Sequence, residues 1–415
     1  MRQCDAASYD TQDKLTVSSL WYRSVQSPFD NMTFEENGAL NRGMAANADG
    51  VYVSGRSSNS SSASAYLDKY DPNTGERIRR IELAADATID FYPCNDVFTD
   101  SKGNVCIANL SLNLSTTPIV IHMVNLDDGS LTEVARLTGS TGRVDHVGVY
   151  GDVTSGNFTV FAAVSNTKSM RRWQVTDGTP SVTSRTITNF YPSGASGWGT
   201  APRVHPVSNT QVYVDGGNTA WSLYEWEGRQ AVLKGSFAQA PALAPEDCSD
   251  NGGAVFRLGD KRYSVHNIQY SKNGSTFAIC EAGDADDFSG MKQLWRVPKG
   301  GLGTVASGSC SAPVAATIVS PGVAHVYIYS PGNGLAAYEV IDHSIAAVDE
   351  IMAENGGMRV EGLKVIFTAP QNAIVAYTVA GVQVAAAGAA TELTLPASGT
   401  YIIKADGKSK LVYVR

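Results

Sequence analysis

Long apolar runs and high charge density are both missing from this chain of 415 residues, of which only 17% are charged. No stretch approaches the roughly 18 apolar residues of a membrane-spanning helix, so we expect no membrane span. The opening residues, Met1-Arg2-Gln3-Cys4-Asp5, lack the apolar segment of a signal peptide. Acidic residues outnumber basic ones by 40 to 32. This balance argues against a nucleic-acid partner, because nucleic-acid-binding proteins usually present a basic face.

Familiar catalytic and zinc-binding motifs are also absent. The chain contains neither a Gly-x-Ser-x-Gly elbow nor a His-Glu-x-x-His pair. Its six cysteines never lie two to four residues apart, so no zinc spacing occurs. We expect Cys106 and Cys280, inside apolar runs, to be buried. Cys248 is a candidate to pair with Cys310 or Cys280 if the protein is exported.

What the chain does contain is a repeat across residues 40–340. Five aromatic runs close with glycine at positions 75, 129, 178, 228 and 300, at separations of 54, 49, 50 and 72 residues. Strongly β-forming runs such as Gln211–Asp215 recur in each unit, and hairpin signals such as Asn47–Gly50 precede several of them. Units of four short strands every 40–50 residues or so are typical of a β-propeller. Trp173, Trp226 and Trp295 recur at one position of the unit, which predicts packing between blades.

The predicted fold class is all-β, a six-bladed propeller followed by a small β-sandwich. The units span about 40–83, 92–137, 143–190, 199–237, 254–309 and 311–341. The sixth unit lacks an outer strand, and we expect residues 14–25 to complete it and close the ring. The propeller then spans 14–343, and residues 1–13 are expected to be a leader or disordered. A seven-bladed ring is the alternative if residues 238–270 contain an extra blade.

The period ends near Asp342, and residues 344–415 contain six or seven short strands, which predicts an immunoglobulin-like sandwich. The run AYTVAGVQVA, followed by LTLPASGTYIIKADGKSKLVYVR, resembles the C-terminal sorting domains of type IX secretion in Bacteroidetes. The matching positions are Gly381, Leu395, Gly399, Tyr401, Ile402 and Arg415. The Asn-Pro dipeptide common near the start of such domains is absent.

This resemblance implies export machinery as a partner and a secreted location, or one on the outer-membrane surface of a Gram-negative bacterium. An accessory sandwich without a sorting role is the alternative. The stretch NRGMAANADGVYVSGR, followed by YDPNTGE, is also similar to exported propellers of uncharacterised function from the same bacteria.

Polar residues begin the first strand of five of the six predicted units. In a propeller these strands line the central channel, so their entry residues converge on one mouth. Arginine pairs with carboxylates and phosphates, and His and Asp supply acid–base capacity. The sequence therefore predicts a ligand site formed by Arg42, Asp96, Asp145, His146, Arg203 and His266. Internal salt bridges are the alternative interpretation of the same residues.

Two loops add weaker candidates. Trp198 lies in a Gly/Ser-rich loop and is predicted to be exposed, where it would stack on a sugar ring. The acidic run after Glu281 contains Asp284, Asp286 and Asp287, a weak calcium candidate because hard cations prefer oxygen clusters. The run lacks the twelve-residue calcium loop, so a solvated loop is favoured and no metal or cofactor is expected.

The leading hypothesis is an exported or cell-surface propeller that binds a glycan, a peptide or a small polar ligand at the channel mouth without catalysis. One alternative is an exported hydrolase or lyase acting on a carbohydrate through Asp96 and Asp145, with His146. A protein-interaction scaffold is the other.

Overall fold

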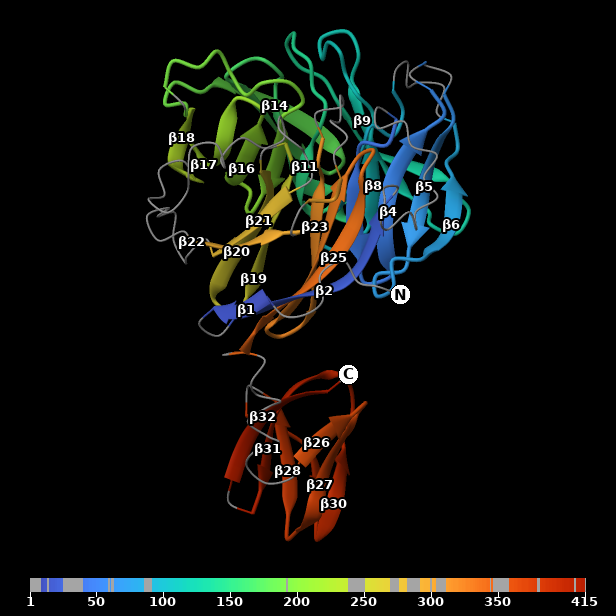
Figure 1. The fold of residues 1–415 in the computed structure, drawn as a ribbon, viewed down its shortest axis with the longest axis vertical. Coiled ribbons are helices and arrows are strands. Elements are labelled where there is room, and N and C mark those ends of the chain that lie inside the picture. Colours follow the sequence, from blue (N-terminus) through green and yellow to red (C-terminus); the bar gives the residue numbers. More distant parts are fainter. Residues whose placement is uncertain are drawn as a thin grey trace. The chain divides into compact units, whose positions relative to one another are not determined.

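The computed structural model describes residues 9–12, 15–24, 40–58, 60, 63–85, 92–191, 193–237, 251–268, 276–281, 292–298, 301–303, 311–343, 345, 358–378, 381–406 and 408–414 (Figure 1). They form an all-β structure of antiparallel sheets, as the sequence predicts. The chain divides into two compact units: a larger one that includes residues 17–319 and 324–339, and a smaller one that includes the C-terminal strands. Among the described residues no helix is long and apolar enough to cross a membrane.

Four consecutive strands form each of the first three sheets of the larger unit. The first sheet contains β3 (Met44–Asn47), β4 (Gly50–Arg56), β5 (Ala65–Tyr70) and β6 (Arg77–Glu82). The second contains β7 (Asp96–Thr99), β8 (Val105–Ala108), β9 (Ile119–Val124) and β10 (Leu131–Leu137). The third contains β11 (Gly148–Asp152), β12 (Asn157–Ala163), β13 (Ser169–Thr176) and β14 (Thr179–Thr186). A short 3-10 helix, Val153–Ser155, joins β11 to β12.

The next two sheets repeat this arrangement, and the last one includes the N-terminal strands. The fourth sheet contains β15 (Arg203–Pro206), β16 (Gln211–Gly216), β17 (Thr219–Glu227) and β18 (Gln230–Ser236). The fifth contains β19 (Gly253–Leu258), β20 (Lys261–Ile268), β21 (Thr276–Glu281) and β22 (Lys292–Val297). The last has the order β1-β2-β25-β24-β23, with β1 (Tyr9–Gln12), β2 (Leu15–Ser24), β23 (Val314–Ser320), β24 (Val323–Ser330) and β25 (Gly334–Asp342). An N-terminal strand, β2, therefore lies beside β25, the last strand of this region.

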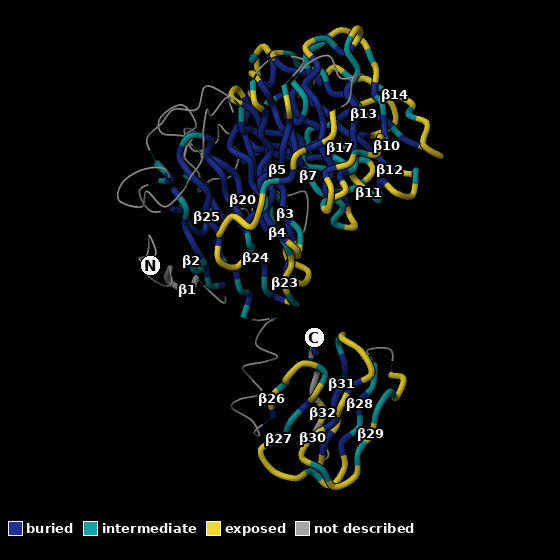
Figure 2. Tube along the Cα trace, turned by 90° about the vertical axis from the view of Figure 1, so that its right-hand side faces the viewer, coloured by how far each residue is buried: buried dark blue, intermediate teal, exposed yellow. Residues whose placement is uncertain are grey.

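Hydrophobic clusters join successive sheets, and the strands are mostly buried while the turns are exposed (Figure 2). Tyr52 of the first sheet, for example, shares a cluster with Val97 of the second. Another cluster contains Trp21 and Tyr327 of the last sheet together with Val51 of the first. The sheets at the two ends of the series are thus packed together, and the fold is propeller-like.

The first strands of neighbouring sheets lie side by side. Contacts join β3 to β7, β11 to β15, and β15 to β19. Gly148 permits one of these approaches, because a Cβ atom there would overlap Pro206 and the carbonyl oxygen of Val204. The polar residues at the starts of these strands are thereby brought close to a common centre.

The smaller unit contains two sheets that share one core. One sheet contains β26 (Met358–Glu361), β27 (Lys364–Gln371) and β30 (Ala390–Thr394). The other has the order β29-β28-β31-β32, with β28 (Ile374–Thr378), β29 (Gln383–Ala387), β31 (Gly399–Ala405) and β32 (Lys408–Val414). Val365 and Phe367 of the first sheet cluster with Ile374 and Ile403 of the second.

The fifth sheet differs from the sequence alignment of the repeats. We aligned His266 with the first strands, but it lies on β20, the second strand, because residues 253–258 already form the first strand. Trp295 likewise lies on β22, the fourth strand, whereas Trp173 and Trp226 lie on third strands. The hairpin between β19 and β20 turns at Gly259-Asp260 and not at an Asn-Gly or Asp-Gly pair, and the sequence alignment of this unit is displaced by one strand.

The cysteine predictions fall partly within the described residues. Cys106 and Cys280 are both 0% exposed, which confirms the prediction that they are buried. Cys248 and Cys310 lie outside the described residues.

Candidate functional site

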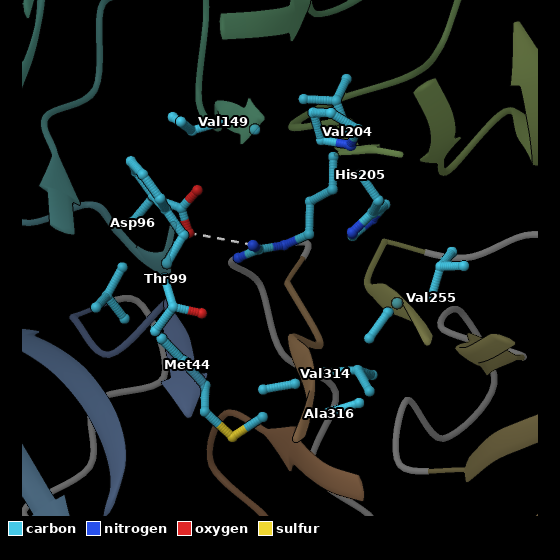
Figure 3. A pocket seen from close by; sticks show the side chains of 18 of the residues that line it. Met44, Asp96, Thr99, Val149, Val204, His205, Val255, Val314 and Ala316 are labelled. Atoms are coloured by element: carbon cyan, nitrogen blue, oxygen red, sulfur yellow. Dashed lines mark hydrogen bonds and ion pairs between the residues drawn. The ribbon is translucent and has the colours of Figure 1, made fainter. Parts of the chain in front are cut away.

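A cavity of about 220 Å³ lies where the first strands of the six sheets meet (Figure 3). Each of the six first strands contributes to its wall, in which most lining residues are aliphatic but polar atoms make up more of the accessible surface than apolar atoms. The wall includes Met44, Val97, Val149, Val204, Val255, Val314 and Ala316. The polar side chains among the lining residues are those of Asp96, Thr99, Arg203 and His205.

An ion pair between Asp96 and Arg203 forms the polar part of this wall. The Arg203 Nη1 atom donates to Asp96 Oδ1 at 3.1 Å, shown as the dashed line in Figure 3. His146 Nδ1 lies 3.2 Å from the other oxygen, Asp96 Oδ2. All three side chains are at least nine-tenths buried, at 2%, 8% and 1% exposed for Asp96, Arg203 and His146. Burial of the Asp96 and Arg203 charges is tolerable because the two groups face each other.

A residue in the left-handed backbone conformation precedes each partner of the ion pair. Cys94 and Ala201 lie two residues before Asp96 and Arg203, and each has a φ of 53°. Left-handed conformations cost non-glycine residues about 1 kcal/mol or more, and such strain is often found at functional sites. Each partner of the ion pair therefore follows, two residues later, a non-glycine residue in the left-handed conformation.

Further contacts hold the Arg203 guanidinium in place. Its Nη2 atom donates to the backbone oxygen of Arg42 and to Ser311 Oγ, both at 2.8 Å. Ser311 Oγ itself donates to the Arg42 oxygen at 2.6 Å. The guanidinium thus links four sheets or loops that are distant in sequence.

A second buried carboxylate, Asp145, has its own arginine partners. Arg143 Nη2 lies 2.6 Å and Arg42 Nη2 lies 3.6 Å from Asp145 Oδ1. Ser165 Oγ donates to Asp145 Oδ2 at 2.7 Å. Both carboxylate oxygens are thereby occupied by residues of the chain itself.

Asn95 connects these groups. Its Oδ1 atom accepts from Arg42 Nη1 at 3.2 Å and from Arg56 Nη1 at 3.1 Å, and its Nδ2 donates to the Asp145 backbone oxygen at 2.8 Å. The structure therefore brings together five of the residues that the sequence places at the channel: Arg42, Asp96, Asp145, His146 and Arg203. Of these five, only Asp96 and Arg203 line the cavity.

Charge interactions set the protonation of this network. Burial opposes ionisation of Asp96, but Arg203 and His146 outweigh it and hold the pKa of that carboxyl below its usual range. Burial likewise opposes ionisation of Asp145, and Arg143 and Arg42 lower its pKa overall. The pKa of His146 is lowered, first by burial and then by Arg203. The network thus consists of two carboxylates, their arginine partners and a neutral imidazole.

His205 and its partner Asp215 belong to the site but were not singled out from the sequence. His205 Nε2 lies 3.1 Å from Asp215 Oδ2, and Asp215 Oδ1 accepts the backbone N–H of Arg203 at 3.1 Å. The His205 ring lies against Trp221, with centroids 4.8 Å apart. The alternation of a strand is the signal that would have found it, because Arg203 and His205 are two residues apart and share a face.

His266 lies elsewhere, within an aromatic cluster. It stacks on Trp221 at 5.7 Å between ring centroids and contacts Phe237 at 4.4 Å. It is fully buried and does not line the cavity. The correction follows from its position on a second strand, where the side chain is directed between sheets.

Trp198 is not the exposed loop residue that the sequence suggests. It is 0% exposed, packs edge-on against Phe190 and Tyr224, and donates Nε1–H to the Ser169 oxygen at 3.2 Å. The Gly/Ser-rich loop around it folds over the indole because an apolar ring of this size gains most from burial. The calcium candidates Asp284, Asp286 and Asp287 lie outside the described residues.

Comparisons with known proteins find solved structures with a similar fold, but no matching family model and no matching curated protein. A solved DUF4623 family protein from Bacteroides eggerthii is similar with a TM-score of 0.53 and 13% identity, covering 77% of this chain and 74% of that one. A structural genomics protein of unknown function from Bacteroides thetaiotaomicron has a TM-score of 0.44 and 16% identity, covering 79% and 76%.

A mutant of the Aleuria aurantia lectin in complex with alpha-methyl-L-fucoside has a TM-score of 0.45 and 10% identity, covering 74% of this chain and 92% of that one. Of these three structures, the Bacteroides eggerthii protein has a TM-score high enough to indicate a shared fold. At 13% identity this similarity concerns the fold alone.

Proposed function

We propose that this protein binds a small ligand in the cavity at the centre of its six sheets and performs no chemistry on it. The observation that carries the proposal is a cavity lined by all six first strands, with the polar side chains of Asp96, Thr99, Arg203 and His205 in its wall. Concave sites with a few fixed polar groups are the usual form of small-molecule sites. The volume of about 220 Å³ is below the roughly 300–1,000 Å³ of pockets for drug-sized molecules, so the ligand is small.

The charge network supports binding over the alternative of carbohydrate hydrolysis. A glycosidase needs one carboxyl that remains protonated to act as a general acid. The pKa values of Asp96 and Asp145 are both lowered, and both carboxylates are engaged by arginines. Neither side chain has the environment of a general acid, and Asp145 does not line the cavity.

We further propose that the six sheets are the blades of one closed six-bladed propeller, with β2 as the fourth strand of the last blade. The packing of Trp21 and Tyr327 against the first sheet supports this closure. We also propose that the smaller unit is an immunoglobulin-like module, since its two sheets share one core.

The proposed location, secreted or on the bacterial surface, is supported by the sequence resemblance of the C-terminal module to sorting domains. Expression of the chain with and without residues 344–415, each preceded by the same signal peptide for crossing the inner membrane, in a bacterium with type IX secretion, followed by fractionation, tests it. The full chain is expected outside the cell and the shortened chain inside. Equal export of both would contradict the sorting role.

The binding proposal is tested with a panel of small sugars, cyclic polyols, carboxylic acids, amines and dipeptides, measured by saturation-transfer NMR and calorimetry on the full chain. Ala316→Phe places a ring at the cavity wall and is expected to abolish binding of any compound that wild type binds. Val182→Phe, on β14 at a position 43% exposed, is the matched control and is expected to bind normally. Equal binding by wild type and Ala316→Phe would place the ligand outside the cavity.

A further inference from the structure

The third sheet is locally basic, although the whole chain is acidic. Its strands and turns carry twice as many basic residues as acidic ones: Lys168, Arg171, Arg172 and Arg185 against Asp152 and Asp177. The two carboxylates lie at the same end of the sheet, where Asp152 pairs with Asn157 and the Asp177 N–H donates to the Asn157 side chain. Asp177 is five residues beyond Arg172, or about 16 Å along an extended strand. The acidic end of the sheet is therefore separate from its basic residues.

Arg172 and Arg185 lie on the same face of this sheet. Arg172 is paired with Thr183 across β13 and β14, and Arg185 follows Thr183 by two residues. Paired residues share a face, as do alternate residues of a strand, so the two arginines are diagonal neighbours with Cβ atoms about 7–8 Å apart. Like charges at this separation repel each other, which favours an anion that contacts both. Arg171 lies on the opposite face of β13.

Aromatic rings between the third and fourth sheets support three basic side chains. The rings are buried in one cluster, whereas the basic side chains are half-buried. Stacking on a ring restricts a long side chain before any ligand binds, which lowers the entropic cost of binding. We call the three side chains the basic face. Each lies over a different ring, with the charged group 6.0 Å from the centroid for Arg172 over Phe161, 5.6 Å for Arg185 over Trp226 and 5.3 Å for Lys168 over Phe190.

The protein supplies neutral acceptors, and no counter-charge, to the basic face. Arg172 donates from Nε to the Asn209 oxygen at 2.9 Å and from Nη2 to Gln174 Oε1 at 3.1 Å, and Arg185 donates from Nη1 to the Ser184 oxygen at 2.7 Å. Among the described residues no carboxylate lies within 4.0 Å of the three basic groups. Arg172 Nη1 and Arg185 Nη2 have no hydrogen-bond partner in the same part of the chain, and neither atom is buried. Both donors are therefore accessible to an acceptor from outside.

Arg80 shows how the same fold compensates a comparable cation. It lies 3.7 Å from the centroid of Tyr66 and donates from Nε and Nη2 to the two oxygens of Asp68, both at 2.9 Å. The hydrogen bonds to Asp68 raise the pKa of Arg80, whereas burial lowers the pKa of Arg172. A carboxylate or a similar oxyanion from a ligand would give Arg172 what Asp68 gives Arg80.

The exposure of the basic face favours a polymeric anion. One ion pair near the surface contributes little binding free energy, so a ligand with a single charge binds weakly. A polymer with an anionic group on successive units contacts several basic groups at once and gains from their effective concentration. Groups fixed directly to a sugar ring lose less freedom on binding than the flexible side chains of an acidic peptide. The net charge of −8 repels polyanions from the rest of the surface, which confines contact to this face.

We infer that Lys168, Arg172 and Arg185 form a binding surface for an acidic polysaccharide, whose carboxylate or sulfate groups accept from Arg172 Nη1 and Arg185 Nη2. This surface lies between the third and fourth sheets and is separate from the central cavity, which none of the three residues lines. The inference therefore goes beyond the proposed function and does not depend on it.

The inference is tested by affinity electrophoresis and calorimetry of the full chain with polygalacturonate, heparin and the neutral polymer dextran, at low and high salt. At least one acidic polysaccharide is expected to bind, dextran is not, and the affinity should fall as salt screens the charges. A preference for polygalacturonate identifies carboxylate as the recognised group, and a preference for heparin identifies sulfate. Equal or tighter binding of poly-L-glutamate, or of vesicles of anionic lipid, would overturn the polysaccharide class, as would binding of neither acidic polysaccharide.

A charge-matched pair of variants locates the surface. Arg172→Gln/Arg185→Gln removes both charges and keeps polar side chains of moderate length, and is expected to weaken binding about tenfold or more. Arg257→Gln/Arg359→Gln makes the same change in net charge at exposed arginines on β19 and β26, and is expected to bind within about twofold of wild type. Equal weakening by the two variants would show that net charge decides binding and would refute the assigned surface.

Two further measurements keep the outcome clear. If Arg172→Gln/Arg185→Gln fails to fold, modification of wild type by phenylglyoxal, mapped by mass spectrometry, takes its place. Bound polysaccharide is expected to protect Arg172 and Arg185 but not Arg257, and unprotected Arg172 and Arg185 at saturation would disprove the inference. Ala316→Phe, which alters the cavity, is expected to bind acidic polysaccharide as wild type does. Loss of that binding in Ala316→Phe would place the polymer in the cavity, whereas failure of small compounds to bind the cavity leaves this surface unaffected.

Discussion

Arg203 and Asp96 are 107 residues apart in the sequence, yet their side chains form a buried ion pair with Nη1 and Oδ1 3.1 Å apart. They come from β15 and β7, the first strands of the fourth and second sheets. The second and fourth sheets are not consecutive in the chain, because the third sheet lies between them. The ion pair therefore spans the centre of the larger unit. The same ion pair forms part of the cavity wall. Its two residues therefore contribute both to the packing of the fold and to the proposed binding site.

Removing one partner of the Asp96–Arg203 ion pair should destabilise the folded protein. Asp96→Asn leaves the Arg203 guanidinium buried without its counter-charge, and we expect it to lower the free energy of unfolding by about 3–5 kcal/mol. Urea denaturation followed by tryptophan fluorescence measures the change. Glu133→Gln is the matched control, because Glu133 pairs with Arg136 at the surface, and it should cost less than about 1 kcal/mol. Equal effects of the two substitutions would show that the buried pair contributes no more than an exposed one.

His266 should make the fold sensitive to mild acid. Burial, and secondly His205, lowers its pKa from 6.5 to about 3. Because the folded-state pKa lies below the unfolded one, the unfolded chain binds the extra proton between these values. Its contribution to stability is complete above about pH 6.5 and is lost as the pH falls toward 3, with a slope of up to about 1.4 kcal/mol per pH unit.

The measurement is the free energy of unfolding of wild type and His266→Phe between pH 8 and pH 4. In the variant, the free energy of unfolding should change less steeply with pH, by an amount that corresponds to about one proton taken up on unfolding. Some pH dependence should remain, because the pKa of His146 is also lowered. Parallel curves for the two proteins would mean that His266 titrates alike in both states.

Trp198 should contribute to stability. Trp198→Ala removes a fully buried indole from between Phe190 and Tyr224, and we expect a loss of about 3–5 kcal/mol in urea denaturation. Trp198→Phe retains most of the apolar ring and should cost less. A stable Trp198→Ala protein that had lost sugar binding would instead support the exposed position suggested by the sequence.

The docking of β2 can be tested at Gly75. The turn that contains it packs on Trp21, whose Nε1 donates to the Pro72 oxygen at 2.9 Å, and a Cβ atom at Gly75 would overlap the indole. Gly178 has a similar φ of 76°, against 67° for Gly75, but nothing lies within 4 Å of its Cβ position. Gly75→Ala should therefore cost about 1–3 kcal/mol more than Gly178→Ala in thermal or urea unfolding. If both substitutions lowered the free energy of unfolding equally, the loss would come from backbone conformation alone. Trp21 would then shift away from the added methyl group at no cost.

Local patterns predicted the strands well but not every position within a sheet. Hairpin signals such as Asn47–Gly50 define turns directly, and the structure pairs Asn47 with Gly50 at the end of β3 and β4. The first turn of the fifth sheet is Gly259-Asp260 and not Asn-Gly or Asp-Gly, and the sequence alignment displaces its strands by one and places His266 at the channel. Trp198 was misassigned for a related reason, because glycine and serine around an indole indicate a loop but do not say whether the loop covers the ring.

The sequence by itself determined the all-β class, the repeat and the residue types at the starts of the first strands, since these depend on local periodicity and turn chemistry. Only the tertiary structure decided which of those residues meet. Asp96 is paired with Arg203, Asp145 with Arg143 and Arg42, and His205 with Asp215. The pairs Asp96–Arg203 and Arg42–Asp145 depend on how sheets more than 100 residues apart converge, and a charge in the sequence does not specify its partner. Because the sheets converge in this way, most of the buried polar residues pair with one another. Asp96, Arg203 and His205 remain at the cavity wall.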